Sequence, residues 1–361
     1  MRSLTVTVEG ITTLSTVWVG RGLLHSLPSL LESSAYTKIV SVSDSGAAHV
    51  TEAVRSSLRL ATEQVLILPG GESCKRLEEL QRVWEFFASQ RLDRRALVIV
   101  IGGGAVSDLV GFAAATYMRG ITYVPVPTTL LAQVDASIGG KSGINFGGAK
   151  NILGVIRQPQ GIVVDVDTLS SLPPRDLRSG FAEIVKHGLI VDRAYFERVI
   201  TKECTTWSPD ELVDIIFRSC EIKRNVVEAD ESEQGIRKTL NFGHTLGHAI
   251  EAYGIHDGIS ITHGEAVAIG MNAASFISHR QGLLSEADYR TVVDGLRTVG
   301  LPTHLSVAMS PERLMHLITL DKKNVGGKMK WTLLSALGHA LYDQEVEDSV
   351  VHEAIKLIQP A

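Results

Sequence analysis

The residues best suited to chemistry are histidines gathered in a short segment. Four of the twelve histidines lie within twenty positions, at His244, His248, His256 and His263. His244 and His248 are four residues apart, a spacing that places two imidazole rings on one face of a helix, as in helical zinc sites. A single histidine is usually a surface or hydrogen-bonded core residue. A cluster of this density instead indicates a bound divalent metal ion.

Carboxylates and a further histidine accompany this cluster. Glu183 and His187 repeat the four-residue spacing, and Glu265 follows His263 by two positions. One carboxylate with two imidazoles is a familiar catalytic zinc set, because it leaves coordination positions open. More candidates are present than one ion needs. Spacing alone does not decide among Glu183, His187, His244, His248, His263 and Glu265.

Three consecutive glycines at 102–104 follow an apolar run and precede a predicted helix at 105–116. Glycines here let backbone N–H groups approach a pyrophosphate, and the helix N-terminus adds partial positive charge. Asp44 ends an earlier predicted strand, where a carboxylate suits the ribose hydroxyls of NAD. The common dinucleotide fingerprint has its acid about 20 residues after the glycines. Since Asp44 precedes them, we expect an NAD site on a sheet unlike a standard Rossmann half.

Cationic residues flank both candidate sites. Lys141 and Lys150 lie in a glycine-rich segment (138–154) with little apolar periodicity, which we interpret as a loop. Lys186 comes three residues after Glu183, and Arg237 precedes His244 by seven. Single lysines are usually solvated surface residues. Several cations beside a metal, however, indicate an anionic substrate that carries phosphate and carboxylate groups.

Two sequence patterns along the chain predict the elements that position these residues. Up to about residue 175, short β-branched runs alternate with helical periods, which is typical of a parallel α/β domain. The strands are expected at 37–43, 65–68, 97–101, 121–124 and 162–166, with a helix near 77–87. After Pro173 and Pro174, amphipathic helices are expected at 183–200, 211–227, 240–252, 263–281, 284–298 and 311–319. The prediction is an NAD-binding α/β domain (1–175) and an all-α metal- and substrate-binding domain (176–361), with the active site between them.

Composition excludes several classes of protein. The chain has 361 residues, 44% of them hydrophobic, and a formal net charge of −5 without any lysine or arginine run, which argues against nucleic acid or membrane partners. Three scattered cysteines cannot form a disulfide framework or a thiolate metal site. The N-terminus alternates like a strand and lacks the features of a signal peptide, and no apolar run approaches the roughly 18 residues of a membrane span. We expect a cytoplasmic enzyme with a small substrate.

Taken together, the motifs resemble the 3-dehydroquinate synthase family from about Asp44 to Ala336. They are 102–109 (GGGAVSDL), 117–120 (YMRG), 126–135 (VPTTLLAQVD), 139–141 (GGK), 150–151 (KN), 182–186 (AEIVK), 241–248 (NFGHTLGH), 263–265 (HGE) and 321–323 (DKK). The resemblance implies a sugar phosphate cyclase that uses NAD and zinc, with cobalt as a possible metal. It also implies a nucleotide-binding domain followed by a helical domain, and a homodimer.

The resemblance also implies residue roles. The zinc ligands would be Glu183, His244 and His263. Cofactor-binding positions would be Asp44, Glu72, Lys75, Gly103, Gly104, Asp108, Thr128, Thr129, Lys141 and Lys150. Catalytic and substrate positions would be Asp135, Lys141, Asn151, Lys186, Lys223, Arg237, Asn241, His248 and Lys328, together with Arg119, which would reach the neighbouring subunit's site.

The implied reaction converts 3-deoxy-D-arabino-heptulosonate 7-phosphate to 3-dehydroquinate and phosphate, in the shikimate pathway to aromatic amino acids. It would proceed through transient oxidation by NAD, phosphate elimination, re-reduction and an intramolecular aldol closure. One rival is a secondary-metabolism cyclase that makes a valiolone or a deoxy-inosose from a sugar phosphate without the carboxylate. Another is a metal-dependent polyol dehydrogenase, whose substrate would not need so many cations.

Overall fold

The computed structural model describes residues 1–7, 15–147, 149–320 and 329–360. By their internal contacts these residues form two units, Met1–Leu172 with Ser208–Glu228, and Pro173–Trp207 with Ala229–Ala361. The first break lies close to the predicted boundary at 175. The sequence placed 211–227 in the second domain, whereas the contacts of helix α7 (Pro209–Ala229) group Ser208–Glu228 with the first unit. There the Cys220 thiol contacts the Gln133 carbonyl oxygen at 3.4 Å.

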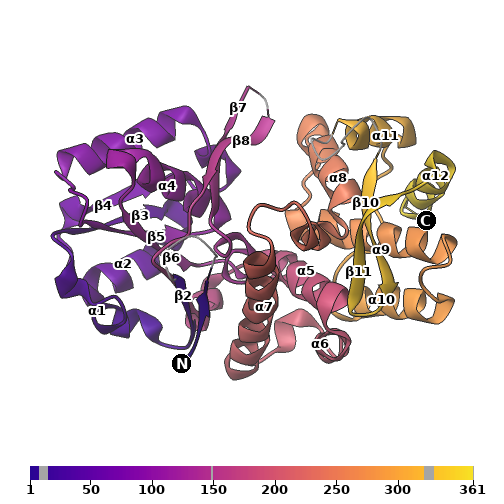
Figure 1. Ribbon diagram of the computed structural model, residues 1–361, viewed down its shortest axis with the longest axis horizontal. Helices are drawn as coiled ribbons and strands as arrows, with labels where there is room; N and C mark the ends of the chain where they lie inside the picture. The colour runs from indigo at the N-terminus through magenta and orange to yellow at the C-terminus, as the bar shows by residue number, and fades with distance from the viewer. Residues whose placement is uncertain (8–14, 148, 321–328, 361) are drawn as a thin grey trace. The chain divides into compact units, whose positions relative to one another are not determined.

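Four parallel strands form the main sheet of the first unit (Figure 1). Their order is β4 (Val65–Leu68), β3 (Ile39–Asp44), β5 (Leu97–Gly102), β6 (Thr122–Pro127). A second sheet joins β1 (Arg2–Val6), β2 (Ser15–Gly20) and β9 (Gly161–Asp165). The strands expected from β-branched runs are therefore confirmed, with ends that differ by a few residues.

Helices cover both faces of the four-stranded sheet, with α1 and α2 on one side and α3 and α4 on the other (Figure 1). The bounds are α1 (Leu27–Leu30), α2 (Ala48–Ser57), α3 (Leu77–Ser89) and α4 (Gly104–Thr116). The sequence of β5 is wholly apolar because helices cover both faces of this strand. Val98 and Val100 pack under α3 and α4, whereas Leu97, Ile99 and Ile101 pack under α1 and α2.

The glycine-rich segment 138–154 is not a loop. It forms most of an antiparallel hairpin of β7 (Lys141–Phe146) and β8 (Ala149–Ile156), with a register shift between Ile144 and Phe146. The sequence gives little strand signal, because β8 is almost entirely exposed and so has no apolar alternation. Glycines instead allow close backbone contact, since a Cβ on Gly154 would lie 2.5 Å from the Ser142 carbonyl oxygen.

The second unit is mainly helical, as predicted. Its helices are α5 (Pro174–Val191), α6 (Arg193–Val199), α8 (His244–Asp257), α9 (His263–Arg280), α10 (Glu286–Thr298), α11 (Pro311–Thr319) and α12 (Asp348–Leu357). It also contains the antiparallel hairpin β10 (Lys330–Ala336) and β11 (His339–Glu345), so the unit is not purely α. Over the described residues, no helix has the length and apolar character needed to cross a membrane.

Helices α5, α8 and α9 pack unusually closely because glycines face backbone. A Cβ on Gly264 would collide with the Ser179 carbonyl oxygen of α5, and one on Gly270 would collide with the Gly243 carbonyl oxygen. The Gly264 N–H also donates to Ser179 Oγ at 2.9 Å. This close approach brings side chains near the N-termini of α8 and α9 together with the middle of α5.

Candidate metal and nucleotide sites

Three helices of the second unit bring a carboxylate and two imidazoles to one point. Glu183 lies in the middle of α5, while His244 and His263 are the first residues of α8 and α9. Glu183 Oε1 is 3.6 Å from His244 Nε2 and 3.5 Å from His263 Nε2. Spacing left six candidates open, and the structure gathers these three as one possible ligand group.

The geometry fits a zinc ion. Two ligand atoms bound to a tetrahedral zinc at about 2.0–2.1 Å lie roughly 3.4 Å apart, close to the separations observed. The Glu183 side chain is fully buried, and neither of its carboxylate oxygens has a hydrogen bond of regular geometry within the described residues. A buried carboxylate is costly unless an ion or a hydrogen bond compensates it. A divalent cation among these atoms would supply that compensation.

Positive charge surrounds this carboxylate. The buried Lys186 ammonium forms an ion pair with Glu183 one helical turn away. Burial alone would raise the pKa of Glu183, but Lys186 and His263 outweigh it and hold that pKa well below its usual range. For His263, burial opposes the charged ring, yet the adjacent carboxylates of Glu183 and Glu251 raise its pKa to about 10.

The outer nitrogens of both histidines are also engaged. His244 Nδ1 lies 3.2 Å from the Phe242 carbonyl oxygen, and His263 Nδ1 lies 3.0 Å from Glu251 Oε2. Both rings therefore direct Nε2 toward Glu183. Our sequence reasoning missed Glu251, although a signal was available. It follows His244 by seven residues and His248 by three, so all three occupy one face of α8.

The remaining candidates for the metal site are His248, Glu265 and His187. The His248 ring is 5.2 Å from the His244 ring and 6.4 Å from the His263 ring, centroid to centroid. Glu265 is committed elsewhere, because it closes the capping box of α9 with Thr262 and forms a bidentate ion pair with Arg175. His187 is fully buried in α5.

Two predicted substrate residues lie on the short helix η10 (Ile236–Asn241) that precedes α8. The Arg237 guanidinium is almost completely buried and donates to the Glu231 carbonyl oxygen at 2.7 Å. Asn241 Nδ2 donates to Glu233 Oε1 at 2.8 Å. Glu233, which our sequence reasoning also missed, has a φ of 59°, a conformation that non-glycine residues seldom adopt.

In the first unit, Asp44 and the glycine turn meet although they are far apart in sequence. Strands β3 and β5 are neighbours, so both motifs lie at the same edge of the sheet. Asp44 accepts hydrogen bonds from the N–H groups of Gly103 (3.1 Å) and Gly46 (2.8 Å). Gly102 has a φ of 145°, and a Cβ there would collide with the Asp44 carboxylate. Only glycine at position 102 allows this arrangement. Asp44 therefore lies beside the glycine turn in space, although it comes well before the turn in the sequence.

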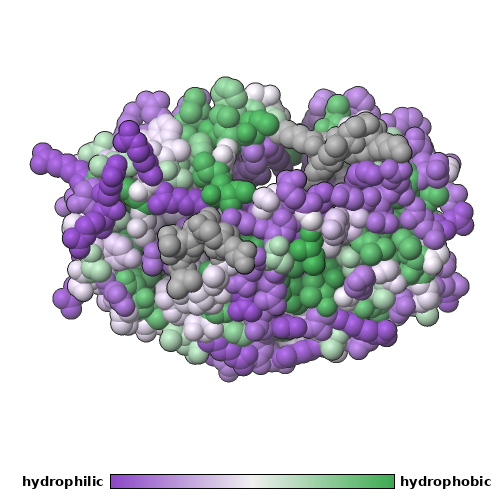
Figure 2. Space-filling view, in the orientation of Figure 1, coloured by the Kyte–Doolittle hydropathy of each residue, from purple (hydrophilic) through white to green (hydrophobic). Residues whose placement is uncertain are grey.

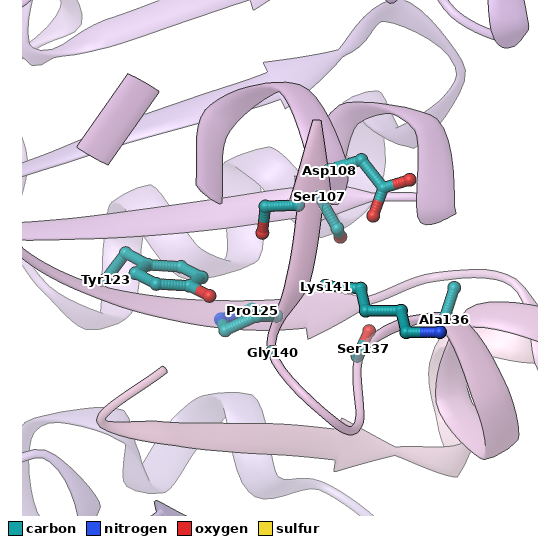
Figure 3. Close-up of a pocket in the computed structure, with 9 residues that line it drawn as sticks. Ser107, Asp108, Tyr123, Pro125, Ala136, Ser137, Gly140 and Lys141 are labelled. Carbon is teal, nitrogen blue, oxygen red and sulfur yellow. The ribbon is translucent and has the colours of Figure 1, made fainter. Parts of the chain in front are cut away.

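A buried lysine and two further acids form a second group of charged residues in this unit. Lys75 Nζ is buried and lies 2.6 Å from Asp108 Oδ2 and 4.0 Å from Glu72 Oε1. Burial raises the pKa of Asp108, and the Lys75 charge opposes that rise. Asp108 lines a small pocket with Lys141, as Figure 3 shows, together with Ser107, Tyr123 and Ser137.

The segment after β6 carries further predicted positions. Thr128 N–H donates to the Gly102 carbonyl oxygen at 2.9 Å, and Thr129 Oγ1 accepts from Ala132 N–H at 3.2 Å. Next comes a π-helical turn, η7 (Ala132–Ala136), of a kind often found at functional sites. On it, Asp135 Oδ1 lies 2.6 Å from Lys223 Nζ of α7. The predicted residues Asp135 and Lys223 are thus directly paired.

The β7–β8 hairpin carries Lys141, Lys150 and Asn151. Asn145, which the sequence did not single out, joins two predicted sites. Its side chain donates to Glu72 Oε1 at 2.9 Å and accepts from Asn151 N–H at 2.9 Å. Arg119 lies outside this hairpin, after α4, and is exposed with a φ of 65°. Lys328, and the 321–323 motif, lie outside the described residues.

Comparisons with known proteins agree over nearly the whole chain. Residues 65–179 match the family model described as 3-dehydroquinate synthase N-terminal, and residues 180–324 match 3-dehydroquinate synthase C-terminal. A 3-dehydroquinate synthase from Nitrosospira multiformis is 44% identical over 293 residues, which cover 80% of this chain and 79% of that protein.

Solved structures of cyclases also match. A 2-deoxy-scyllo-inosose synthase complexed with carbaglucose-6-phosphate, NAD+ and Co2+ superimposes with a TM-score of 0.88 at 27% identity, covering 99% of this chain and 100% of the other. A 2-epi-5-epi-valiolone synthase from Streptomyces hygroscopicus, with NAD+ and Zn2+ bound, gives 0.82 at 25% identity, covering 98% of each chain.

Proposed function

Because the chain belongs to the 3-dehydroquinate synthase family, we propose that it converts 3-deoxy-D-arabino-heptulosonate 7-phosphate to 3-dehydroquinate and phosphate. The observation that carries this proposal is the buried Glu183 carboxylate facing Nε2 of both His244 and His263. Glu183, His244 and His263 would hold the metal, which would supply Lewis acid activation of the substrate hydroxyls. Zinc is the proposed ion and cobalt an alternative.

The second unit provides several of the proposed substrate contacts. Arg237, whose guanidinium is planar and permanently charged, pairs with the substrate carboxylate. Asn241 and His248 contact the phosphate, a role that the family resemblance also implies for Lys141, Asn151 and Lys328. Lys186 balances the charge of Glu183 while it contacts substrate. His248, which lies beside the ligand histidines, relays a proton from the hydroxyl that is oxidised.

The first unit provides the proposed NAD site, and NAD bound there would supply reversible hydride transfer. Asp44 binds the ribose hydroxyls, and its position against Gly103 directs its carboxylate to the glycine turn. The N-terminus of α4 receives the pyrophosphate. Glu72, Lys75, Asp108, Thr128, Thr129 and Lys150 complete the proposed cofactor contacts, and Asp135 and Lys223 those to substrate.

The alternative is a cyclase of secondary metabolism, and the similarity to the solved cyclases favours it as the second candidate. Those enzymes are related to this chain at 25–27% identity, whereas the Nitrosospira 3-dehydroquinate synthase is 44% identical. The buried cation at Arg237 also supports a substrate that carries a carboxylate. We therefore rank the heptulosonate phosphate first.

We further propose a cytoplasmic homodimer in which Arg119 completes the neighbouring subunit's site. Met118 and Arg119 both have left-handed backbone conformations (φ 50° and 65°), which a partner surface would help to hold. The β7–β8 hairpin exposes Phe146, Ile152 and Ile156, and Figure 2 shows hydrophobic residues at its projecting end. An exposed apolar patch of this kind is typical of an interface.

The test supplies the purified protein with the heptulosonate phosphate, NAD and zinc. We expect phosphate to be released without net NADH, because the hydride returns to the sugar. Phosphate released only from a carboxylate-free heptulose phosphate would support the secondary-metabolism alternative. Steady accumulation of NADH would indicate a polyol dehydrogenase, and either result would refute the proposal.

A further inference from the structure

We propose that Glu251 is a positioning residue of the metal site: it holds the proton of His263 on Nδ1, so that Nε2 is left with a lone pair for the ion. This inference rests on the ligand set of the proposed function. It concerns a residue outside that set, and it assigns Glu251 no contact with substrate or metal.

The His263 ring lies between two carboxylates. Its Nδ1 is 3.0 Å from Glu251 Oε2, which is an ordinary hydrogen-bond length, and its Nε2 is 3.5 Å from Glu183 Oε1. A neutral imidazole has one N–H and one lone pair. In the neutral ring that binds metal, an N–H directed at Glu251 leaves the lone pair pointing into the space shared with Glu183 and His244.

The negative charge of Glu251 acts in a setting where solvent screens it weakly. Its side chain is 16% exposed, and the Glu183 carboxylate beyond the ring is fully buried. A carboxylate that accepts from the outer N–H of a ligand histidine fixes the ring orientation and makes the inner nitrogen a stronger donor. Here α8 supplies the ligand His244 and also the residue that orients the ligand of α9.

The other ligand histidine provides an internal comparison. His244 Nδ1 faces the Phe242 carbonyl oxygen at 3.2 Å, a neutral acceptor on the backbone. The two rings are thus held by different acceptors, a peptide carbonyl and a carboxylate. The carboxylate can be changed by mutation without altering any proposed ligand.

The main experiment titrates metal-free protein with Zn2+ and with Co2+ against a chelating dye. Outer partners of ligand histidines contribute about 10–100-fold to metal affinity. We expect Glu251→Gln, which keeps an acceptor but loses the charge, to weaken binding near the lower end of that range. Glu251→Met, which removes both, should approach the upper end and shift the visible spectrum of bound Co2+.

Asp257→Asn is the matched control. Asp257 is on the same helix and its carboxylate also contacts a histidine, His256 Nδ1, at 3.1 Å. Neither Asp257 nor His256 belongs to the candidate ligand group of Glu183, His244 and His263, so wild-type metal affinity is expected. If Glu251→Gln and Glu251→Met bind metal like the wild type, or if Asp257→Asn weakens binding equally, the inference is wrong.

Two further measurements distinguish a failure of this inference from misfolding of the Glu251 variants and from a failure of the proposed ligand set. In zinc-loaded wild-type protein labelled with 15N-histidine, the His263 signal should show a proton on Nδ1; an unprotonated Nδ1 would overturn the inference even if the Glu251 variants do not fold. His263→Ala tests the ligand set itself. If His263→Ala keeps its metal, the ligand assignment fails, whereas metal loss in His263→Ala with normal binding in both Glu251 variants contradicts the role of Glu251 alone.

Discussion

Of the two histidines His244 and His248 on one face of α8, only His244 belongs to the candidate ligand group with Glu183 and His263. His244 Nε2 is within 3.6 Å of the Glu183 carboxylate, and His244 belongs to the candidate ligand group that excludes His248. The i, i+4 spacing correctly predicts that both rings share a helix face. It cannot predict which ring meets Glu183, because that depends on how α5 packs against α8.

The ligand assignment predicts two classes of variant. Glu183→Ala and His244→Ala should lose bound metal, because each removes an inner ligand. His248→Ala should retain metal and lose turnover, because it removes a proton relay and a phosphate contact but no metal ligand. Metal content by mass spectrometry and phosphate release measure the two properties separately. Equal zinc loss in all three variants would contradict the division.

Arg237 is the residue at which substrate identity can be tested. Its loss removes a charge-assisted hydrogen bond, worth about 1.5–3 kcal/mol, or roughly 10–100-fold in binding. We expect Arg237→Met to lower kcat/KM by that factor for the heptulosonate phosphate, and to change it little for an analogue without the carboxylate. Similar losses for both compounds would show that Arg237 supports the fold of η10 instead of recognising the carboxylate.

At the scale of helices, small residues set the distances between metal ligands. Gly264 follows His263 and lies against the α5 backbone at Ser179, four residues before Glu183. Any side chain at 264 must move α9 away from α5. The separation of His263 from Glu183 thus depends on Gly264, which has no side chain that could bind metal or substrate.

Gly264→Ala should therefore destabilise the protein by about 1–3 kcal/mol through overpacking, and it should also weaken metal binding. Gly258→Ala provides a control in the same unit. Gly258 has a φ of 67° and open space around it, so its cost of about 1–2 kcal/mol comes from backbone conformation only. Thermal melting and zinc titration of both variants are the measurements. If Gly258→Ala loses metal to the same extent, general destabilisation explains both results.

The elements themselves show what sequence patterns can and cannot predict. The core strands were evident because strands buried on both faces, such as β5, are continuous apolar runs. The β7–β8 hairpin was mistaken for a loop because β8 is almost entirely exposed and the buried residues of β7 (142–144) are consecutive, so neither strand shows apolar alternation. The role of Asn145 emerged only from its contact with Glu72, a pairing across the chain that leaves no periodic trace in the sequence. The spacing of Glu251 places it on the helix face of His244 and His248, but only the packing of α9 against α8 shows that it contacts His263.

At the scale of the whole molecule, the proposed dimer implies that two chains together complete each active site. Arg119 is exposed on its own chain and follows Met118 in a conformation that non-glycine residues seldom adopt. In a two-fold dimer the same surface is presented by both subunits, so each Arg119 would serve its partner's site. Each isolated subunit would then lack one substrate contact.

Subunit mixing tests this arrangement. Arg119→Ala and His248→Ala should each be inactive alone. The first variant lacks the arginine that completes the partner's site, and the second lacks the proton relay of its own site. After denaturation and co-refolding in equal amounts, half of the dimers carry one subunit of each kind, and each such dimer has one complete site. Activity should therefore return to roughly a quarter of the wild-type level. Mixing His248→Ala with Glu183→Ala is the control, because both lesions lie in the subunit's own site unless these residues also act across the interface. Recovery only in the control, or in neither mixture while size-exclusion chromatography shows dimers, would place Arg119 in its own subunit's site.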